Sequence, residues 1–245
     1  MSFKRINNIT GWIICIIACS VYIMTMEATG SLWDCGEFAS SAYKLQIPHP
    51  PGAPLFVLIG RLFMAPFGPD TAATGINLMS ALASGFTILF LFWTITHFAR
   101  KLVTKGGAEL TTEKIYGIMA AGIVGALAYT FSDSFWFSAV EGEVYASSSF
   151  FTAIVFWAIF KWENVADEPH NLRWLILIAY LMGLSIGVHL LNLLTIPALA
   201  FVYYFRKYPI TKSGIFYTAA LSIAILGFIQ YGIIVGVISL AGSFD

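Results

Sequence analysis

Asp34 and Glu37 lie in a stretch of the chain whose residue types could do proton chemistry. The two carboxylates are spaced so that they would share one face of a helix, and His49 follows at a short distance along the chain. Trp33 and Phe38 flank the carboxylates, so we expect them to shield the acids partly from water and to raise their basicity. A carboxylate of raised basicity is suited to general-base catalysis. We therefore expect this stretch to form the floor of an active site.

These residues also have structural interpretations. Asp34 and Glu37 could lie on a solvated loop, or an acid could cap the first turn of a helix. His49 stands among four prolines of segment 48–54, which restrict the backbone, and it could serve only the shape of that loop.

Four further residues are candidates for the same site. Glu141 and Glu143 would point to nearly opposite sides of a regular helix, but Gly142 between them suggests a helix start or an irregular turn where both could converge. We expect at least one of the two to serve the site. His189 fits a packing residue as well as a ligand. Arg61, in a short apolar segment, would either reach toward water or meet an anion such as a lipid-linked phosphate.

The composition is that of an integral membrane protein. Hydrophobic residues make up 58% of the chain and charged residues 11%, whereas a soluble domain carries about 25% charged residues. The net charge is zero and no basic cluster is interleaved with aromatic residues, so the sequence offers no nucleic-acid-binding surface. We expect the three cysteines to be free thiols that serve packing, with Cys15 and Cys19 one turn apart in an apolar helix and Cys35 beside Asp34.

Hydropathy predicts an all-α polytopic protein. The first apolar segment lacks a signal-peptide cleavage site and is expected to stay as an anchor. The segment 53–67 is too short to span and contains Arg61, so it fits an interfacial or re-entrant helix. Seven spans are expected, at 12–26, 74–98, 115–132, 140–160, 174–190, 192–205 and 214–240.

Charge placement supports this topology independently. With segment 53–67 on the outer side, all of the 13 Lys and Arg residues except Lys44 and Arg61 fall on the inner side, as the positive-inside rule requires for a cytoplasmic N-terminus. The same topology brings the candidate acids and histidines to one outer surface. This convergence is the strongest functional signal that the residues themselves give.

Several of these motifs resemble a bacterial membrane family long described as of unknown function. Its animal relative is a protein O-mannosyltransferase of the endoplasmic reticulum, and the family is placed in the GT-C glycosyltransferase superfamily. The resemblance covers nearly the whole chain and is carried by residues 32–38 (LWDCGEF), 42–45 (AYKL), 49–55 (HPPGAPL), 60–62 (GRL) and 141–145 (EGEVY).

The resemblance implies a GT-C-like module with seven spans and a long first outer loop, 27–73, that carries short interfacial helices. It implies an enzyme that moves a sugar from a polyprenyl phosphate to an acceptor hydroxyl at the outer face. Asp34 would be the general base, and Glu37 would adjust its pKa or bind the sugar. Some relatives bind a divalent metal at the second outer loop, but Glu-Gly-Glu at 141–143 is not an Asp-x-Asp motif, so a metal stays open.

The resemblance further implies that residues 1–245 are the N-terminal part of a longer protein in a bacterial cytoplasmic membrane. Mannose and protein Ser/Thr come from the animal relative, and a glycan or lipid acceptor is equally reasonable chemistry. Two other classes stay open: a non-catalytic membrane scaffold, and a transporter or channel. The latter is disfavoured because the acids gather at one surface and no internal repeat is visible.

Overall fold

The computed structural model of the protein describes residues 2–244, and over that range the only regular elements are helices. Met1 and Asp245, the ends of the expected module, lie outside the described residues. The elements follow in the order α1 (Phe3–Thr25), α2 (Cys35–Lys44), α3 (Pro54–Met64), η1 (Pro69–Thr71), α4 (Ala72–Val103), η2 (Lys105–Gly107), α5 (Thr112–Thr130), α6 (Asp133–Ala139), α7 (Val144–Val165), α8 (Leu172–Ile186), η3 (Leu190–Thr195), α9 (Ile196–Lys207), α10 (Lys212–Gly227), the π-helical turn η4 (Phe228–Ile234) and α11 (Val235–Gly242).

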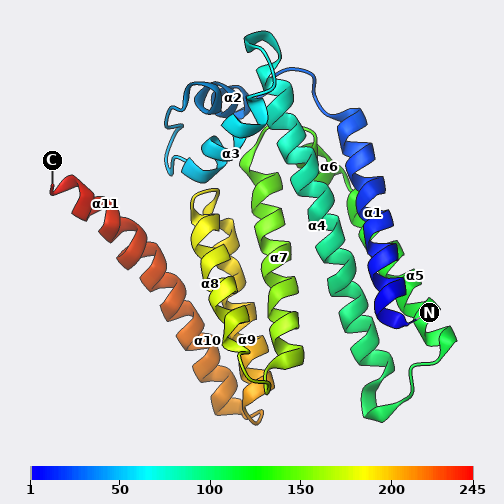
Figure 1. The fold of residues 1–245 in the computed structure, drawn as a ribbon. Helices are drawn as coiled ribbons and strands as arrows, with labels where there is room; N and C mark the ends of the chain where they lie inside the picture. The colour runs from blue at the N-terminus through cyan, green and yellow to red at the C-terminus, as the bar shows by residue number, and fades with distance from the viewer. Residues whose placement is uncertain (1, 245) are drawn as a thin grey trace.

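The long helices form a bundle in which α4 is central. It packs against α1, α5 and α7, and α7 in turn packs against α8 and α9 (Figure 1). The short helices α2 and α3 lie together over one end of the bundle. This arrangement suits an apolar chain with few charges. Each helix buries part of its surface against its neighbours, and the remaining apolar surface can contact lipid.

Several helices are long and apolar enough to cross a membrane. They are α1, η1 with α4, α7, and the continuous segment Lys212–Gly242; the pair α5 and α6, bent by 67°, qualifies when it is counted as one span. Helix α8 is apolar but shorter. These findings confirm an all-α protein with several apolar helices. Against the seven expected spans, four helices within residues 2–244, or five with the bent pair, have the length and composition of a span.

Several expected boundaries differ from the helix ends. The span expected at 174–190 ends as α8 at Ile186. The span expected at 140–160 begins only at Val144, and residues 140–143 form a bend before it. The span expected at 192–205 begins with the 3-10 turn η3, and its α-helix, α9, starts at Ile196. The span expected at 115–132 ends at Thr130, and the chain then bends into α6.

An apolar cluster fixes α2 and α3 to the end of the bundle. Phe38 of α2 packs edge-on against Phe56 of α3, with ring centroids 5.3 Å apart, and both are buried with Ile76 of α4. Gly75 permits close contact between α4 and α3, because a Cβ at this position would lie 2.7 Å from the Phe63 carbonyl oxygen of α3. The two short helices are therefore held by packing, which makes them a rigid support for the residues they carry.

The start of α3 is also anchored to the end of α8. Pro54 occupies its first turn, where a missing N–H costs nothing. The next two N–H groups, of Leu55 and Phe56, both donate to the carbonyl oxygen of Gly187, at 2.7 and 3.2 Å. This carbonyl satisfies helix donors that would otherwise lack partners, and it ties α3 to the end of α8.

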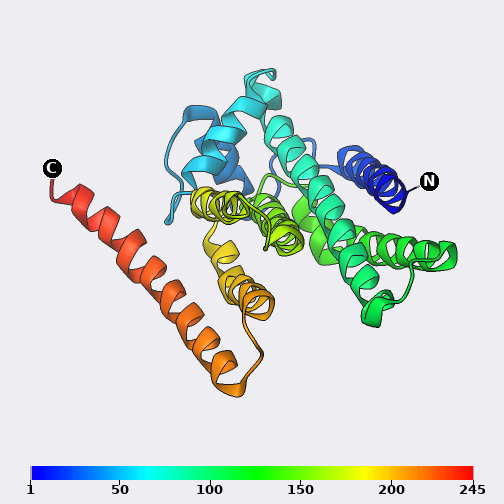
Figure 2. The same cartoon turned by 60° about the horizontal axis from the view of Figure 1, so that its bottom comes forward.

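Helix α10 and its continuation through η4 to α11 leave the bundle at an angle, as both views show (Figure 2). Contact with the rest of the chain is mainly through α9, and Ser222 is the single buried residue of α10. At the junction the Tyr204 hydroxyl donates to the Pro209 carbonyl at 3.0 Å and accepts the Thr211 N–H at 2.9 Å.

The two ends of the bundle differ in charge. We call the end that carries α2, α3, segment 140–143 and η3 the acidic end, and the end where α1 and α5 begin and α4 and α7 finish the basic end (Figure 1). Among the 13 Lys and Arg residues, only Lys44 and Arg61 belong to elements at the acidic end.

Candidate active site at the acidic end

Asp34 occupies the N-cap position of α2 without acting as a cap. Its side chain makes no capping hydrogen bond, while its backbone carbonyl accepts the Phe38 N–H at 2.9 Å. The preceding residue, Trp33, has a left-handed backbone conformation with φ 61°, which is uncommon for a bulky side chain. The exposed Asp34 carboxylate is therefore free of any structural hydrogen bond in its own helix turn.

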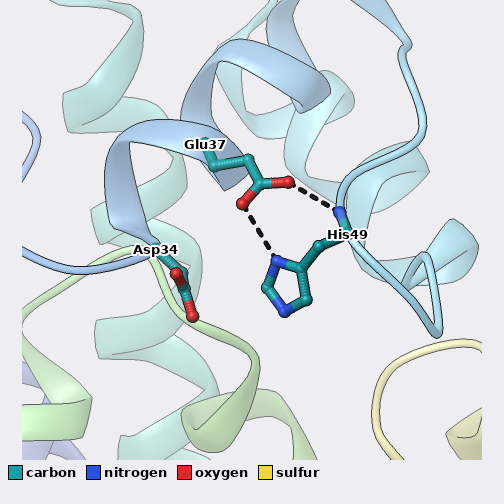
Figure 3. Close-up of side chains that lie close together, drawn as sticks. All are labelled: Asp34, Glu37 and His49. Atoms are coloured by element: carbon teal, nitrogen blue, oxygen red, sulfur yellow. Dashed lines mark hydrogen bonds and ion pairs between the residues drawn. The ribbon is translucent and has the colours of Figure 1, made fainter.

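Glu37 and His49 form the best-defined contact at this end (Figure 3). The His49 backbone N–H donates to Glu37 Oε1 at 2.6 Å, and His49 Nδ1 lies 2.9 Å from Glu37 Oε2. This bonding lowers the pKa of Glu37 and raises the pKa of His49, in each case because the hydrogen bond favours the charged form. His49 therefore does more than stiffen the proline-rich loop: it connects that loop to α2.

Asp34 stands beside this pair. Atoms of Asp34, Glu37 and His49 that could bind a ligand all lie within 4.8 Å of one another, and the three side chains share the open side of α2 in Figure 3. The expected shielding was wrong, because Trp33 is 86% exposed and Phe38 packs inward instead. The pKa of Glu37 is lowered, not raised.

A second cluster lies directly behind the first and is buried. Cys35, Glu141 and Glu143 are 1%, 5% and 6% exposed, and their Sγ and carboxylate atoms fall within 4.8 Å of one another. The Cys35 thiol donates a long hydrogen bond, of 3.8 Å, to Glu143 Oε1. Both glutamates therefore converge on one point, as Gly142 between them allowed.

Gly142 explains why the two glutamates can converge. A Cβ at Gly142 would lie 2.6 Å from Ile76 Cγ2 and 3.0 Å from Asn77 Oδ1, so only glycine lets segment 140–143 approach α4 this closely. The Glu143 N–H also donates to the Glu141 carbonyl at 2.9 Å, which makes the segment an irregular turn instead of a helix.

Asn77 joins this turn to the start of the first long loop. Its Nδ2 donates to the Glu27 and Thr29 carbonyl oxygens at 2.7 and 3.0 Å, and the Glu27 N–H donates to the Val140 carbonyl at 2.9 Å. Asn77 is 1% exposed, so these bonds satisfy a buried amide that would otherwise be costly. The loop that leads to Asp34 is thus fixed against α4.

The buried cluster has an unusual charge balance. Burial raises the pKa of Glu143, and the nearby charges of Glu141 and Asp34 raise it further. Burial and the charges of Glu141 and Glu143 raise the pKa of the Cys35 thiol, which stays protonated as a hydrogen-bond donor. Among the described residues, no lysine or arginine forms an ion pair with these acids. Asp34 lies between this buried acidic cluster and the exposed Glu37–His49 pair.

Both clusters offer groups that could hold a divalent metal. Asp34, Glu37 and His49 supply oxygen and nitrogen donors on the open side, whereas Cys35 adds sulfur to two carboxylates in the buried cluster. Mg²⁺ prefers oxygen ligands, so the thiol suits it poorly and fits zinc better. The exposed carboxylates of Asp34 and Glu37 can also act as acid–base groups without an ion.

Arg61 and His189 lie at the acidic end but outside both clusters. The Arg61 guanidinium stacks over the Tyr43 ring, 5.0 Å from its centroid, and takes part in none of the ion pairs of residues 2–244. His189 lies against the Tyr145 ring, with centroids 5.4 Å apart, and its Nδ1 accepts the Leu191 N–H at 3.1 Å. Burial lowers the pKa of His189. Its hydrogen bond to the backbone of its own turn supports the structural interpretation.

Three residues that the sequence did not single out help to form the site. Cys35 was expected to serve packing, Tyr145 was part of the motif at 141–145 but no candidate site residue, and Asn77 carried no prediction; each touches a candidate residue or its loop. An asparagine near the start of a long apolar helix is the one signal that could have identified Asn77.

A bundle of apolar helices with an acid-rich site at one end defines this chain as a multi-pass membrane protein. Residues 34–212 match the model of the family described as Protein O-mannosyl-transferase TMEM260 N-terminal domain, and the chain belongs to this family. The match starts at Asp34 and includes both clusters.

Two relatives agree with this assignment. The mouse protein named Protein O-mannosyl-transferase TMEM260 is 25% identical over 167 residues, which cover 68% of this chain and 21% of the relative. The Dictyostelium discoideum protein of the same name is 25% identical over 188 residues, 74% of this chain and 21% of the relative. The chain therefore spans about a fifth of the length of these relatives. No solved structure matches the chain.

Proposed function

We propose that the protein is a membrane glycosyltransferase that moves a sugar from a polyprenyl-phosphate carrier to an acceptor hydroxyl. The observation that carries this proposal is the exposed Asp34 carboxylate, which no capping bond occupies and which stands beside the Glu37–His49 pair. The name of the two relatives, protein O-mannosyl-transferase, supports the same reaction type and suggests mannose and a protein hydroxyl as substrates.

In this reaction Asp34 is the general base. A sugar phosphate already carries a good leaving group, so the enzyme has to place the acceptor oxygen near the anomeric carbon and remove its proton. Asp34 takes that proton. The Glu37–His49 pair holds the segment of chain beside it and offers hydrogen bonds to sugar hydroxyls, while Glu141 and Glu143 form the buried acidic side of the site.

The donor would approach from within the membrane. An apolar cavity of about 660 Å³ between α4, α5, α7 and α9 reaches Tyr129 and Leu191 at the acidic end, and it would accommodate part of a polyprenyl chain. Arg61, free of any carboxylate partner within residues 2–244, would then meet the donor phosphate. His189, on the same side, would border the sugar.

This assignment includes an orientation and a fold class. We propose a GT-C-like module of seven spans, α1, α4, α5 with α6, α7, α8, α9 and α10 with α11, in a bacterial cytoplasmic membrane. The basic end faces the cytoplasm by the positive-inside rule, and the loop 27–73 faces outward with α2 and α3 along the membrane surface. This chain would be the N-terminal module of a longer enzyme whose remaining parts handle the acceptor.

Glycoproteomics of cells with and without the gene tests the proposal. We expect loss of one defined O-linked sugar from surface or periplasmic glycoproteins, and its return when the full-length protein is re-expressed. An unchanged glycoprotein profile and unchanged glycans of other kinds in the deletion strain would contradict a transferase and favour a membrane scaffold.

A further inference from the structure

A second polar cavity lies at the basic end, far from the acid clusters. Its volume is about 340 Å³ and it opens between α1, α4 and α7. Its lining combines cationic, amide and aromatic side chains: Lys4, Asn7, Asn8, Arg100, Lys161 and Asn164, with Phe3, Trp93, Trp157 and Phe160.

The cavity is positively charged. Lys4, Arg100 and Lys161 all line it, no carboxylate is among its described lining residues, and none of the three takes part in the ion pairs of residues 2–244. The Arg100 guanidinium lies 4.9 Å from the Phe3 ring centroid and the Lys161 ammonium 5.2 Å from that of Trp157. Aromatic rings hold both cations in place without neutralising them.

The nearest acid does not balance this charge, because it is already engaged. Glu163 bonds His97 Nε2 at 3.1 Å and Lys101 Nζ at 2.5 Å, one oxygen to each partner. His97 lines the cavity but turns this nitrogen to Glu163. Two polar atoms of lining residues, Asn7 Oδ1 and Trp93 Nε1, are buried without a hydrogen-bond partner. Among the described residues, the cavity therefore has three cations without a carboxylate partner, and Trp93 Nε1 is an unpaired donor of a lining residue.

The depth of this cavity matches a lipid headgroup. Lys161 follows Glu143 by 18 positions of continuous chain on α7, and at 1.5 Å per residue this is roughly 27 Å along the helix. The hydrocarbon core of a bilayer is about 30 Å thick. When the acid clusters lie at one membrane surface, the cations of this cavity lie at the other, and tryptophans are the residues expected at that level.

We propose that this cavity binds a phosphate group, supplied by the headgroup of an anionic lipid in the leaflet at the basic end. Three cations around one polar cavity match the charge and hydrogen-bonding capacity of a phosphate, and their aromatic neighbours match the adjoining acyl region. The inference does not depend on the proposed transferase activity, because the acidic end enters it only as a marker of membrane depth.

Thermal unfolding of the purified full-length protein tests this site. The added ligands are phosphatidylglycerol, phosphatidylcholine, and inorganic phosphate at matched ionic strength. A ligand that binds the folded state raises the Tm, so we expect phosphatidylglycerol to raise it more than phosphatidylcholine does. If inorganic phosphate raises the Tm as well and competes with the lipid, the phosphate comes from solution; if only the lipid acts, the headgroup is the ligand.

Neutralising variants locate the effect. Lys/Arg side chains near a membrane contribute about 1 kcal/mol each, or roughly fivefold in affinity, so Arg100→Gln with Lys161→Gln should weaken phosphatidylglycerol binding roughly 25-fold. The matched control is Lys105→Gln with Lys212→Gln, which removes the same charge at the same end outside the cavity. Equal binding in the two double variants would overturn the proposal. Native mass spectrometry of the wild-type protein needs no variant, and equal retention of the two lipids would overturn it too.

Discussion

His49 contacts Glu37 with two groups at once, its backbone N–H at 2.6 Å and its Nδ1 at 2.9 Å. A bond of this kind links the proline-rich loop to the first turn of α2, one turn from Asp34. The pair therefore fixes the surroundings of the proposed base, although both side chains are partly open to water.

The Glu37–His49 pair predicts a pH window. The pKa of His49 is raised above its ordinary 6.5, so its contribution is fully present below pH 6.5 and is lost as pH rises through the raised value. The pKa of Glu37 is lowered below 4.5, so its contribution is present above pH 4.5 and is lost as pH falls through the lowered value. We therefore expect the pair to stabilise the fold most between pH 4.5 and pH 6.5, where both contributions are present.

Titration of the His49 ring by NMR checks this window. In Glu37→Gln the pKa of His49 should fall toward 6.5, because the hydrogen bond to a carboxylate is its largest cause. Glu109→Gln, in the loop at the basic end, is the control and should leave it unchanged. An equal pKa in wild type and Glu37→Gln would contradict the pairing.

Gly142 should tolerate no side chain. In Gly142→Ala the new Cβ would meet Ile76 and Asn77 at 2.6 and 3.0 Å, and overpacking of this kind costs about 1–3 kcal/mol. We expect a lower Tm together with loss of transfer, since Glu141 and Glu143 would be displaced. Gly117→Ala in α5, where no atom lies within 4 Å of the new Cβ, is the matched control and should keep both.

Glu143→Gln should separate stability from activity. Because burial raises the pKa of Glu143, ionising it destabilises the fold as pH rises above its ordinary 4.5. Its neutral amide removes that cost, so we expect a higher Tm than wild type at pH 8, no difference at pH 4, and weaker transfer. The melts include EDTA, so that a bound ion does not mask the effect. A lower Tm at pH 8 would contradict the expected cost of ionising Glu143.

Arg61 should serve the donor phosphate. A hydrogen bond to a charged group contributes about 1.5–3 kcal/mol, so Arg61→Gln should raise the KM for a polyprenyl-phosphate sugar roughly 10- to 100-fold. Lys44→Gln removes the other cation of the acidic end and is the control. If both variants raise the KM equally, the effect is one of general charge and Arg61 has no specific contact.

Much of the acidic end could be predicted from the sequence, because ionisable residues in an apolar chain are conspicuous and helix direction alternates. Asp34, Glu37 and His49 are near in sequence, and their meeting needs only the short helix α2 and the loop that follows it. The positions of Lys and Arg predicted which loops share an end.

The buried cluster could not be predicted in the same way. Cys35 meets Glu143 across 108 positions of the chain, and this contact depends on Asn77 and Gly142 holding two loops against α4. No local periodicity encodes such a contact. The start of α7 at Val144, four residues after the expected start at 140, has the same origin. Gly142 fits closely against α4, and this contact keeps residues 140–143 out of the helix.

The most direct test of the account is transfer by Asp34→Asn in membranes that contain the full-length protein and a labelled polyprenyl-phosphate sugar. Asparagine keeps the shape of the side chain but cannot accept the acceptor proton, so transfer should fall about 10²–10⁴-fold with donor binding kept. Asp70→Asn, an exposed acid in η1 at the same end, is the matched control and should transfer normally. Wild-type rates in a folded Asp34→Asn protein would contradict Asp34 as the base.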